Sequence, residues 1–331
     1  MECIQLGSSG LECARIGLGT WAIGGREWGG TDEAQAIATI HAAIDRGITL
    51  IDTAPIYGFG RAEQLVGAAL AQGRLRERVL IATKCGLSWQ GERVYRDSRP
   101  ATVRRELEDS LRRLRTDVID LYQVHWPDLQ TPFEETAATL ETFRQEGKIR
   151  AIGVSNCSTA QMEAFRAVIP LTSVQPPYNL FERAIEHDVL PYASRHGVAV
   201  LAYSALCRGL LTGRLRPDTR FGDDEVRHVD PKFQGERYRH YLAAVDALDA
   251  LSQRRFDVPV LALALRWVLD QGASVALWGA RRPEQLDPIG AIEGWQLDDE
   301  ARGEIDAILA RHIHEPLQPS FLEPPRVRPV L

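Results

Sequence analysis

Short apolar runs alternate with amphipathic segments along most of the chain. Eight of these runs have the length and the aliphatic content of buried strands: 17–21, 48–52, 79–84, 118–124, 149–154, 171–175, 198–203 and 274–278. Between them, apolar residues recur at helical spacing, as in Val103, Leu107 and Leu111. Strands that alternate with helices form a parallel sheet, and eight such units close into a barrel. The pattern therefore predicts an α/β protein with one (β/α)8 TIM-barrel domain over residues 1–331.

Further elements are predicted outside the eight repeated units. The runs 2–6 and 11–15 flank GSSG and predict an N-terminal β-hairpin. The segment 213–234 lacks a clear period, and a loop of this length in a compact domain suggests a function. Two extra helices, a last helix and a Pro-rich tail without regular structure are predicted near the C-terminal end: 238–254 and 258–270, 298–312, and 314–331.

Capping residues predict where several helices begin. Thr31 is expected to cap the first helix, and the run 131–134 (TPFE) is expected to form a capping box with Pro at the first helical position. The helix over 98–114 carries many arginines interleaved with acidic residues, Glu106 among them. We interpret this face as solvated, with local ion pairs, and not as a nucleic-acid patch.

Composition and charge exclude several classes of protein. A net charge of −6 gives no reason to expect nucleic acid or an anionic membrane as a partner. No secretory signal is visible, and no apolar run reaches the roughly 18 residues of a membrane helix. The five cysteines are scattered without a C-x-x-C pair, which argues against zinc and against a disulfide framework. We expect a cytoplasmic protein without a metal.

Polar residues or glycine occupy the ends of seven predicted strands: Asp52, Lys84, His125, Asn156, Gln175, Tyr203 and Gly279. Taken singly, Asp52 could cap a turn, and Lys84 or His125 could be a strand-end cation or a core histidine. In a barrel, however, the carboxyl ends of all strands lie on one face, where the βα loops build active sites. Tyr57 lies in a loop with Pro and Gly five residues after Asp52, near the same face. The pattern therefore predicts a catalytic site there.

Seven motifs resemble those of the aldo-keto reductase superfamily, and the later part of the chain looks most like its bacterial general-stress branch. The motifs are IDTAPIYG, IATKCG, LYQVHWPD, IGVSN, VQPPYN, AYSALCRGLL and ALWGARRPEQL. The resemblance implies a reversible NADPH-dependent reduction of aldehydes or ketones by a catalytic tetrad of Asp52, Tyr57, Lys84 and His125. Lys84 would lower the pKa of Tyr57 by ~2–3 units, and Asp52 would orient Lys84. His125 would align the substrate carbonyl.

The resemblance also implies which residues bind the cofactor. Ser155, Asn156 and Gln175 would bind the nicotinamide carboxamide, Tyr203 would stack on the ring, and the segment 204–209 would meet the pyrophosphate. No Gly-rich Rossmann fingerprint is present, as expected for a barrel.

Arg281 would select NADPH over NADH, because a guanidinium fits the 2′-phosphate. The other expected cofactor contacts are Thr20, Trp21, Asp52, Ser204, Ala205, Leu206, Arg208, Gly209, Arg214, Arg227, Gly279, Ala280 and Gln285.

Aromatic residues near strand ends are candidates for the substrate pocket. We expect Trp21, Trp89 and Trp126 to line it with Tyr57 and His125, although packing is an equally good interpretation for Trp89. Three cysteines adjoin proposed site residues, and we interpret them as packing residues, with redox sensing as the alternative: Cys85, Cys157 and Cys207.

Two other functions remain open at this point. A cofactor-binding redox sensor or channel-associated subunit would use the same barrel and tetrad with little turnover. A phosphate-binding barrel isomerase would have no need for the tetrad. The sequence leaves open the physiological substrate, the direction of the reaction in the cell, the strength of the NADP preference and the oligomeric state.

Overall fold

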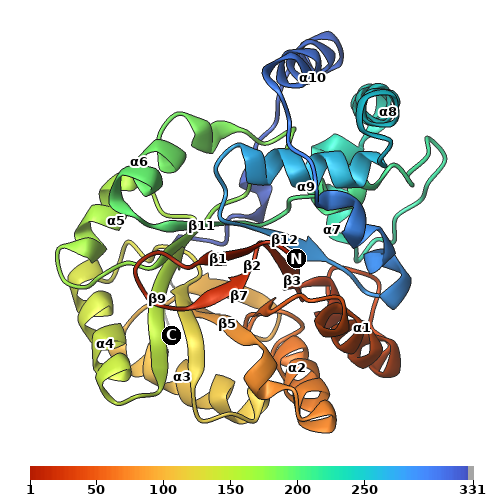
Figure 1. Cartoon of the computed structure of the whole chain (residues 1–331). Coiled ribbons are helices and arrows are strands. Elements are labelled where there is room, and N and C mark those ends of the chain that lie inside the picture. The colour runs from red at the N-terminus through yellow and green to blue at the C-terminus, as the bar shows by residue number, and fades with distance from the viewer. Residues whose placement is uncertain (327–331) are drawn as a thin grey trace.

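Eight parallel strands form a closed barrel at the centre of the computed structural model, which describes residues 1–326 (Figure 1). In order around the barrel they are β3 (Ile16–Gly19), β4 (Leu50–Asp52), β5 (Leu80–Cys85), β8 (Ile119–Val124), β9 (Ile149–Ser155), β10 (Ser173–Gln175), β11 (Ala199–Ala202) and β12 (Val275–Gly279). The barrel closes where β12 pairs with β3, with Gly279 opposite Gly19. The predicted (β/α)8 TIM barrel is confirmed.

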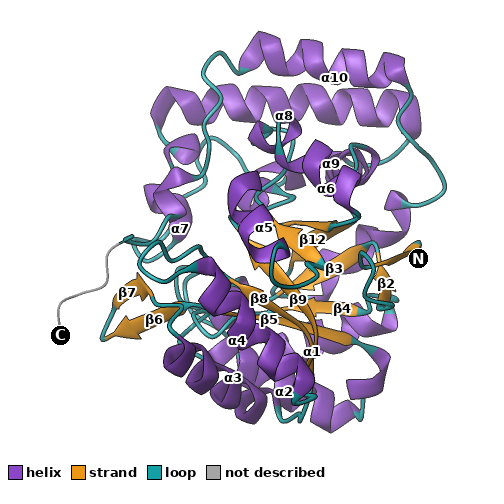
Figure 2. Cartoon of the chain, turned by 90° about the vertical axis from the view of Figure 1, so that its left-hand side faces the viewer, coloured by secondary structure: helices purple, strands orange, loops and turns teal. Residues whose placement is uncertain are grey.

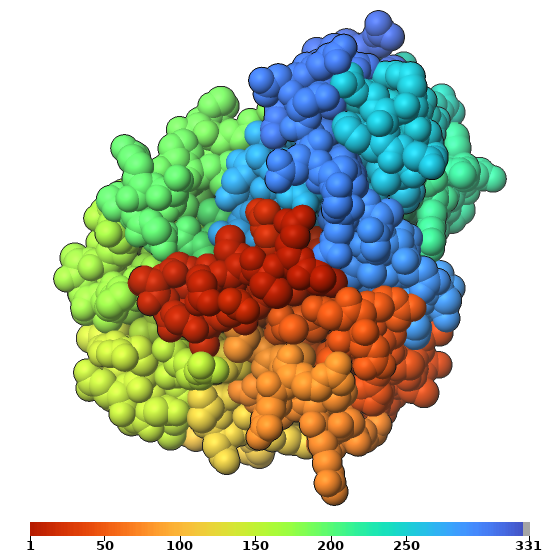
Figure 3. All heavy atoms as spheres, viewed as in Figure 1, coloured from red at the N-terminus to blue at the C-terminus, as the bar shows by residue number. Residues whose placement is uncertain are grey.

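The barrel interior is filled by aliphatic side chains from alternate strand positions, among them Leu50, Leu121 and Leu201. The same apolar cluster includes Leu6 and Leu11, which flank the turn of the N-terminal hairpin. This hairpin pairs β1 (Cys3–Gln5) with β2 (Glu12–Ala14) and lies across the amino-terminal end of the barrel, as Figure 3 shows in red. Because the hairpin closes that end, the face at the carboxyl ends of the strands is the one that remains open to ligands.

Helices surround the barrel and bury their apolar faces on it. They are α1 (Glu33–Asp45), α2 (Arg61–Gly73), α3 (Pro100–Leu114), α4 (Phe133–Gln145), α5 (Thr159–Arg166), α6 (Val189–His196) and α9 (Val260–Asp270). Two further helices, α8 (Gly235–Phe256) and α10 (Asp299–His312), lie side by side outside this ring (Figure 2). None of the helices that the structure describes is long and apolar enough to cross a membrane.

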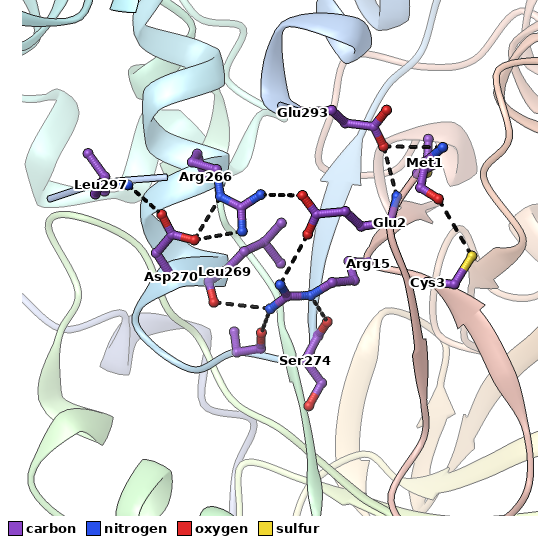
Figure 4. Close-up of polar contacts among 11 residues, drawn as sticks. Met1, Glu2, Cys3, Arg15, Arg266, Leu269, Asp270, Ser274, Glu293 and Leu297 are labelled. Carbon is purple, nitrogen blue, oxygen red and sulfur yellow. Dashed lines mark hydrogen bonds and ion pairs between the residues drawn. The ribbon is translucent and has the colours of Figure 1, made fainter. Parts of the chain in front are cut away.

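A polar network joins the hairpin to the end of α9 (Figure 4). Glu2 accepts hydrogen bonds from Arg266 at 2.7 Å and from Arg15 at 3.3 Å. Arg266 also pairs with Asp270 at 2.6 Å, and Arg15 donates to the carbonyl oxygen of Ala273 at 2.9 Å. These bonds fix the hairpin against the barrel.

Two capping predictions are wrong. Asp32, not Thr31, caps α1, because its carboxylate accepts the Gln35 N–H at 2.9 Å. At α4 no side chain caps the helix, since the Thr131 hydroxyl donates to Asp128 at 2.8 Å instead. At α1, a nearby aspartate thus replaces the predicted threonine as the acceptor.

Glu106 in α3 also departs from its prediction, because it is not on the solvated face. Its carboxylate is buried and accepts hydrogen bonds from the Gly86 N–H at 2.7 Å and from the Ser88 hydroxyl at 3.2 Å. Burial raises the pKa of Glu106 to about 8. The exposed part of the helix does pair locally, as in Arg112 with Asp109 at 2.6 Å.

Several short elements were not predicted. After β5 the chain forms a second hairpin, in which β6 (Leu87–Gln90) pairs with β7 (Arg93–Arg96). The long loop contains α7 (Val226–Val229), and a 3-10 turn, Ser320–Leu322, interrupts the tail. After β12 a helix was expected to begin at Pro283, and the structure has a 3-10 helix there, Pro283–Ile292. The last part of the predicted irregular tail, 327–331, lies outside the described residues.

Candidate active site

A buried ion pair lies beneath the carboxyl face of the barrel. Asp52 is the last residue of β4, and Lys84 lies near the end of the neighbouring strand β5. The Lys84 ammonium donates to both carboxylate oxygens of Asp52 at 2.9 and 2.8 Å and to the Thr53 carbonyl at 2.9 Å. Burial lowers the pKa of Lys84, and the Asp52 carboxylate opposes that shift. A lysine with no exposed surface is thus held by a carboxylate that faces it with both oxygens.

The phenol of Tyr57 lies directly above this pair. Lys84 Nζ is 3.3 Å from the Tyr57 hydroxyl oxygen. Burial, and then the negative charge of Asp52, raise the pKa of Tyr57 well above 10. The net shift is upward, not the expected fall, because burial and the Asp52 charge together outweigh the lowering by Lys84. Tyr57 is therefore a protonated phenol, suited to give a proton to a developing alkoxide.

His125 approaches the phenol from the end of β8. The rings of His125 and Tyr57 meet edge to face, with centroids 5.8 Å apart. Burial, and then the nearby Lys84 charge, lower the pKa of His125 well below 6.5. The imidazole is therefore neutral and can donate one N–H hydrogen bond to a substrate oxygen beside Tyr57.

The ends of the next three strands form one hydrogen-bonded row. The Ser155 hydroxyl donates to the Gln175 carbonyl at 2.7 Å, and the Gln175 amide donates to Asp52 at 2.8 Å. Tyr203 donates to the Asn156 amide oxygen at 3.0 Å, and the Asn156 amide donates to the His125 carbonyl at 3.0 Å. The structure thus brings these four predicted residues together beside the tetrad.

A first cavity of about 540 Å³ opens on one side of Tyr57. The predicted cofactor residues that line it are Thr20, Trp21, Asp52, Tyr203, Ser204, Leu206, Arg208, Gly209, Arg214, Arg227, Gly279, Arg281 and Gln285. Ala205 and Ala280 were also predicted, but both are buried and do not line it. With Arg282, five arginines border this space. Among the described residues that line it, Asp52 is the only acidic one, and it is paired with Lys84.

Three of these arginines already have partners. Arg208 is buried between Glu182 and Asp230. Arg227 pairs with Glu225 and lies over the ring of Trp28, 5.4 Å from its centroid. Arg281 donates to the carbonyl oxygens of Trp28 and Gly30. The Arg281 partners are neutral, so its positive charge is not cancelled.

A second cavity of about 600 Å³ opens on the other side of Tyr57. Predicted residues that line it are Trp21, Tyr57, His125, Trp126, Ser155, Asn156, Gln175 and Tyr203. Trp89 is not among its lining residues, because its ring stacks on Phe59 with centroids 5.2 Å apart. The two cavities share Trp21, Tyr57 and Tyr203, so the phenol stands at their junction.

The outer wall of the second cavity comes from three segments whose lining residues were not predicted for the substrate pocket. Residues of the β6–β7 hairpin, the stretch 223–226 and the tail segment 321–325 border it. Arg96 fixes the tail there by donating to the Pro324 carbonyl at 3.1 Å and pairing with Glu323 at 2.6 Å. Nothing in the sequence around Arg96 indicates that its partners lie more than 200 residues further along the chain.

The three cysteines next to the site are buried thiols. Burial raises the pKa of Cys157 and of Cys207 to about 12, and that of Cys85 well above 9. They stay protonated at neutral pH, which supports packing over redox sensing. Within residues 1–326, the His, Cys, Asp and Glu side chains form no group of three or more that could hold a metal ion.

Comparisons with known proteins find a family model and relatives that match most of the chain. The family model described as "Aldo/keto reductase family" matches residues 15–310. The chain is 52% identical to "Aldo-keto reductase YhdN" of Bacillus subtilis, over 98% of each protein. It is 38% identical to the "NADH-specific methylglyoxal reductase" of Escherichia coli, over 96% of this chain and 100% of that protein.

Solved structures are similar over nearly the whole chain. The glycerol dehydrogenase AKR11B4 from Gluconobacter oxydans has a TM-score of 0.88 and 52% sequence identity, over 97% of this chain and 99% of that one. An aldo/keto reductase from Klebsiella pneumoniae in complex with NADP and acetate has a TM-score of 0.70 and 32% identity, over 91% and 93% of the two chains.

Proposed function

Because this chain belongs to the aldo/keto reductase family of oxidoreductases, we propose that it reduces aldehydes or ketones to alcohols with NADPH, and that it also runs in reverse. The observation that carries this proposal is the place of Tyr57. Its phenol stands at the junction of two cavities and within 3.3 Å of a lysine whose charge Asp52 balances. At that point Tyr57 can give a proton to a substrate that binds in one cavity next to a cofactor bound in the other.

The first cavity fits a nicotinamide dinucleotide. The arginines in its wall suit a polyanionic ligand. Ser155, Asn156 and Gln175, which line the second cavity, offer polar groups near the junction for the nicotinamide end. Tyr203 lines both cavities and offers a ring face at their junction. When bound, the cofactor supplies or accepts the hydride.

The residues of this chain perform the remaining tasks. His125 donates a hydrogen bond to the substrate oxygen and aligns the carbonyl beside Tyr57. Tyr57 gives its proton to that oxygen as charge develops on it. Lys84, which Asp52 holds in position, fixes the phenol and stabilises the phenolate that is left. The aromatic walls, including Trp21 and Trp126, exclude water from the reacting groups.

We assign NADPH as the preferred cofactor because of Arg281. Its guanidinium lies in the wall of the first cavity, and it bonds only to carbonyl oxygens among the contacts seen. A charge-assisted bond to the 2′-phosphate is worth about 1.5–3 kcal/mol. The Klebsiella relative binds NADP, whereas the Escherichia coli relative is named NADH-specific, so the family name alone does not decide the cofactor.

The test measures turnover and cofactor preference together. Purified protein is assayed with NADPH and with NADH against a panel of aldehydes, ketones and sugars. We expect a ratio of kcat/KM for NADPH over NADH well above one, falling roughly tenfold in Arg281→Ala, as about 1.4 kcal/mol gives. Arg282→Ala, which removes the neighbouring exposed arginine, serves as the matched control and should change the ratio less.

Tyr57→Phe tests the chemical step in the same assay. Turnover should fall on the order of 10²-fold or more while NADPH still binds. Wild-type turnover in this variant would contradict the assignment of Tyr57. Cofactor binding without turnover of any carbonyl by the wild type would favour a redox sensor or channel-associated subunit instead.

A further inference from the structure

A buried cluster of four charged side chains lies behind one wall of the first cavity. It contains Arg208, Glu182, Asp230 and Lys232, none of them more than 1% exposed. Arg208 Nε donates to Asp230 at 2.6 Å, and Arg208 Nη2 donates to Glu182. The Lys232 ammonium lies 2.8 Å from the same Glu182 oxygen. Two buried cations thus face two buried anions.

The cluster joins three segments that are distant in sequence. Glu182 follows β10, Arg208 follows β11, and Asp230 with Lys232 lies near the end of the long loop 213–234. Arg208 also donates weakly to the Ser204 hydroxyl at 3.4 Å, so each of its three nitrogens has a partner. Few N–H donors of the Arg208 guanidinium therefore remain to bind an external anion.

The segment that carries Arg208 has a strained backbone. Ser204, Cys207 and Arg208 all have positive φ, at 55°, 46° and 55°. Residues other than glycine adopt this conformation only where surrounding contacts impose it. Ser204, Leu206 and Gly209 from this segment line the first cavity, so the strain lies in its wall.

We propose that Arg208 is a positioning residue, held by Glu182 and Asp230, that keeps the strained segment 204–209 in the shape that binds the cofactor. On this proposal it is not a ligand of the pyrophosphate, in contrast to the role that the resemblance implies. This inference rests on the proposed function, because it assigns the first cavity to a nicotinamide dinucleotide.

The substitution Asp230→Asn separates the two roles by the sign of its effect. Asp230 lines neither cavity. If Arg208 bound phosphate, removing this carboxylate would free the guanidinium and leave the cavity more positive, so an anionic dinucleotide would bind more tightly. If Arg208 positions the segment, the same change loosens the wall and binding weakens.

The experiment measures the Kd of NADPH by quenching of tryptophan fluorescence, since Trp21 and Trp28 line the cavity. Asp230→Asn should raise Kd at least tenfold, with kcat at saturation within threefold. Asp218→Asn, at an exposed acid on the same loop outside both cavities, is the matched control and should leave Kd unchanged. A Kd for Asp230→Asn that is unchanged or lowered overturns the proposal. A fall in kcat as large as the rise in Kd also overturns it.

A second variant guards against a general loss of stability. Asp230→Asn leaves one excess buried cation, and Asp230→Asn/Lys232→Met restores the balance. The double variant is assayed at a temperature at which its circular dichroism is native. A Kd that stays raised supports positioning, and a Kd that returns to the wild-type value overturns it. If wild-type protein binds neither NADPH nor NADH, the proposed function fails; if it binds and these variants match it, only this inference fails.

Discussion

Replacing Lys84 with Met should lower both the stability of the protein and the rate of alcohol oxidation. Lys84 makes two bonds to the buried Asp52 carboxylate, which would keep only the Gln175 amide as a partner among the contacts seen. Removing one partner of a buried ion pair costs about 3–5 kcal/mol. The double variant Lys84→Met/Asp52→Asn leaves no unpaired buried carboxylate, so it should recover much of the lost free energy of unfolding.

The effect on chemistry follows from the distance between Lys84 and Tyr57. A unit charge 3.3 Å from the phenol oxygen stabilises the phenolate by about 5 kcal/mol at an effective dielectric constant of 20, and by about 1.3 kcal/mol in water. These limits correspond to roughly four units and one unit of pKa. Because the pKa of Tyr57 is already well above 10, the phenolate is the minor species. Its fraction falls about tenfold for each unit by which the loss of Lys84 raises that pKa.

The assay is the pH–rate profile of alcohol oxidation with NADP⁺, run on wild type, Lys84→Met and the double variant. In Lys84→Met the oxidation rate at pH 9 should fall at least about tenfold, and the basic limb should move to higher pH. The double variant should lie between the two, since it lacks the repulsion of Asp52. A folded Lys84→Met protein with less than a threefold change in rate would refute the role of Lys84.

Three further predictions concern segments around the site. The loop 213–234 borders both cavities, so limited proteolysis should cut it in the free protein and cut more slowly with NADPH; equal cutting would count against a lid. Glu106 has a pKa of about 8 when folded and about 4.3 when unfolded, so stability should fall as pH rises from about 4.3 to 8. Urea unfolding of Glu106→Gln should lack this slope; an identical slope would refute it. Arg96→Ala frees the tail, and should raise KM for the carbonyl without changing the Kd of NADPH; an unchanged KM would contradict the anchoring role.

The barrel and its catalytic face could be predicted from the sequence because both depend on local patterns. Strand runs and helical spacing recur along the chain, and parallel closure then brings Asp52, Lys84 and His125 to one face. No detail of packing is needed for that step. The strand ends Asn156, Gln175 and Tyr203 follow by the same rule.

The rest of the site depends on contacts between distant segments, which the sequence pattern does not encode. Arg208 matched a motif, but the carboxylates that hold it lie 26 and 22 residues away in other loops. Glu106 lies in an arginine-rich helix, and only the structure shows that it turns inward to Gly86. The pKa of Tyr57 likewise reflects burial together with Asp52, whereas the sequence suggested the lysine alone.

The separation between barrel and outer wall has a consequence for how such an enzyme can change. The tetrad comes from the ends of β4, β5 and β8 and the loop after β4, whereas the β6–β7 hairpin, part of the long loop and the tail form the outer wall of the second cavity. Mutations in that wall leave the barrel core untouched. New substrate preferences can therefore be selected there at little cost in folding, and directed-evolution libraries are best placed in these three segments.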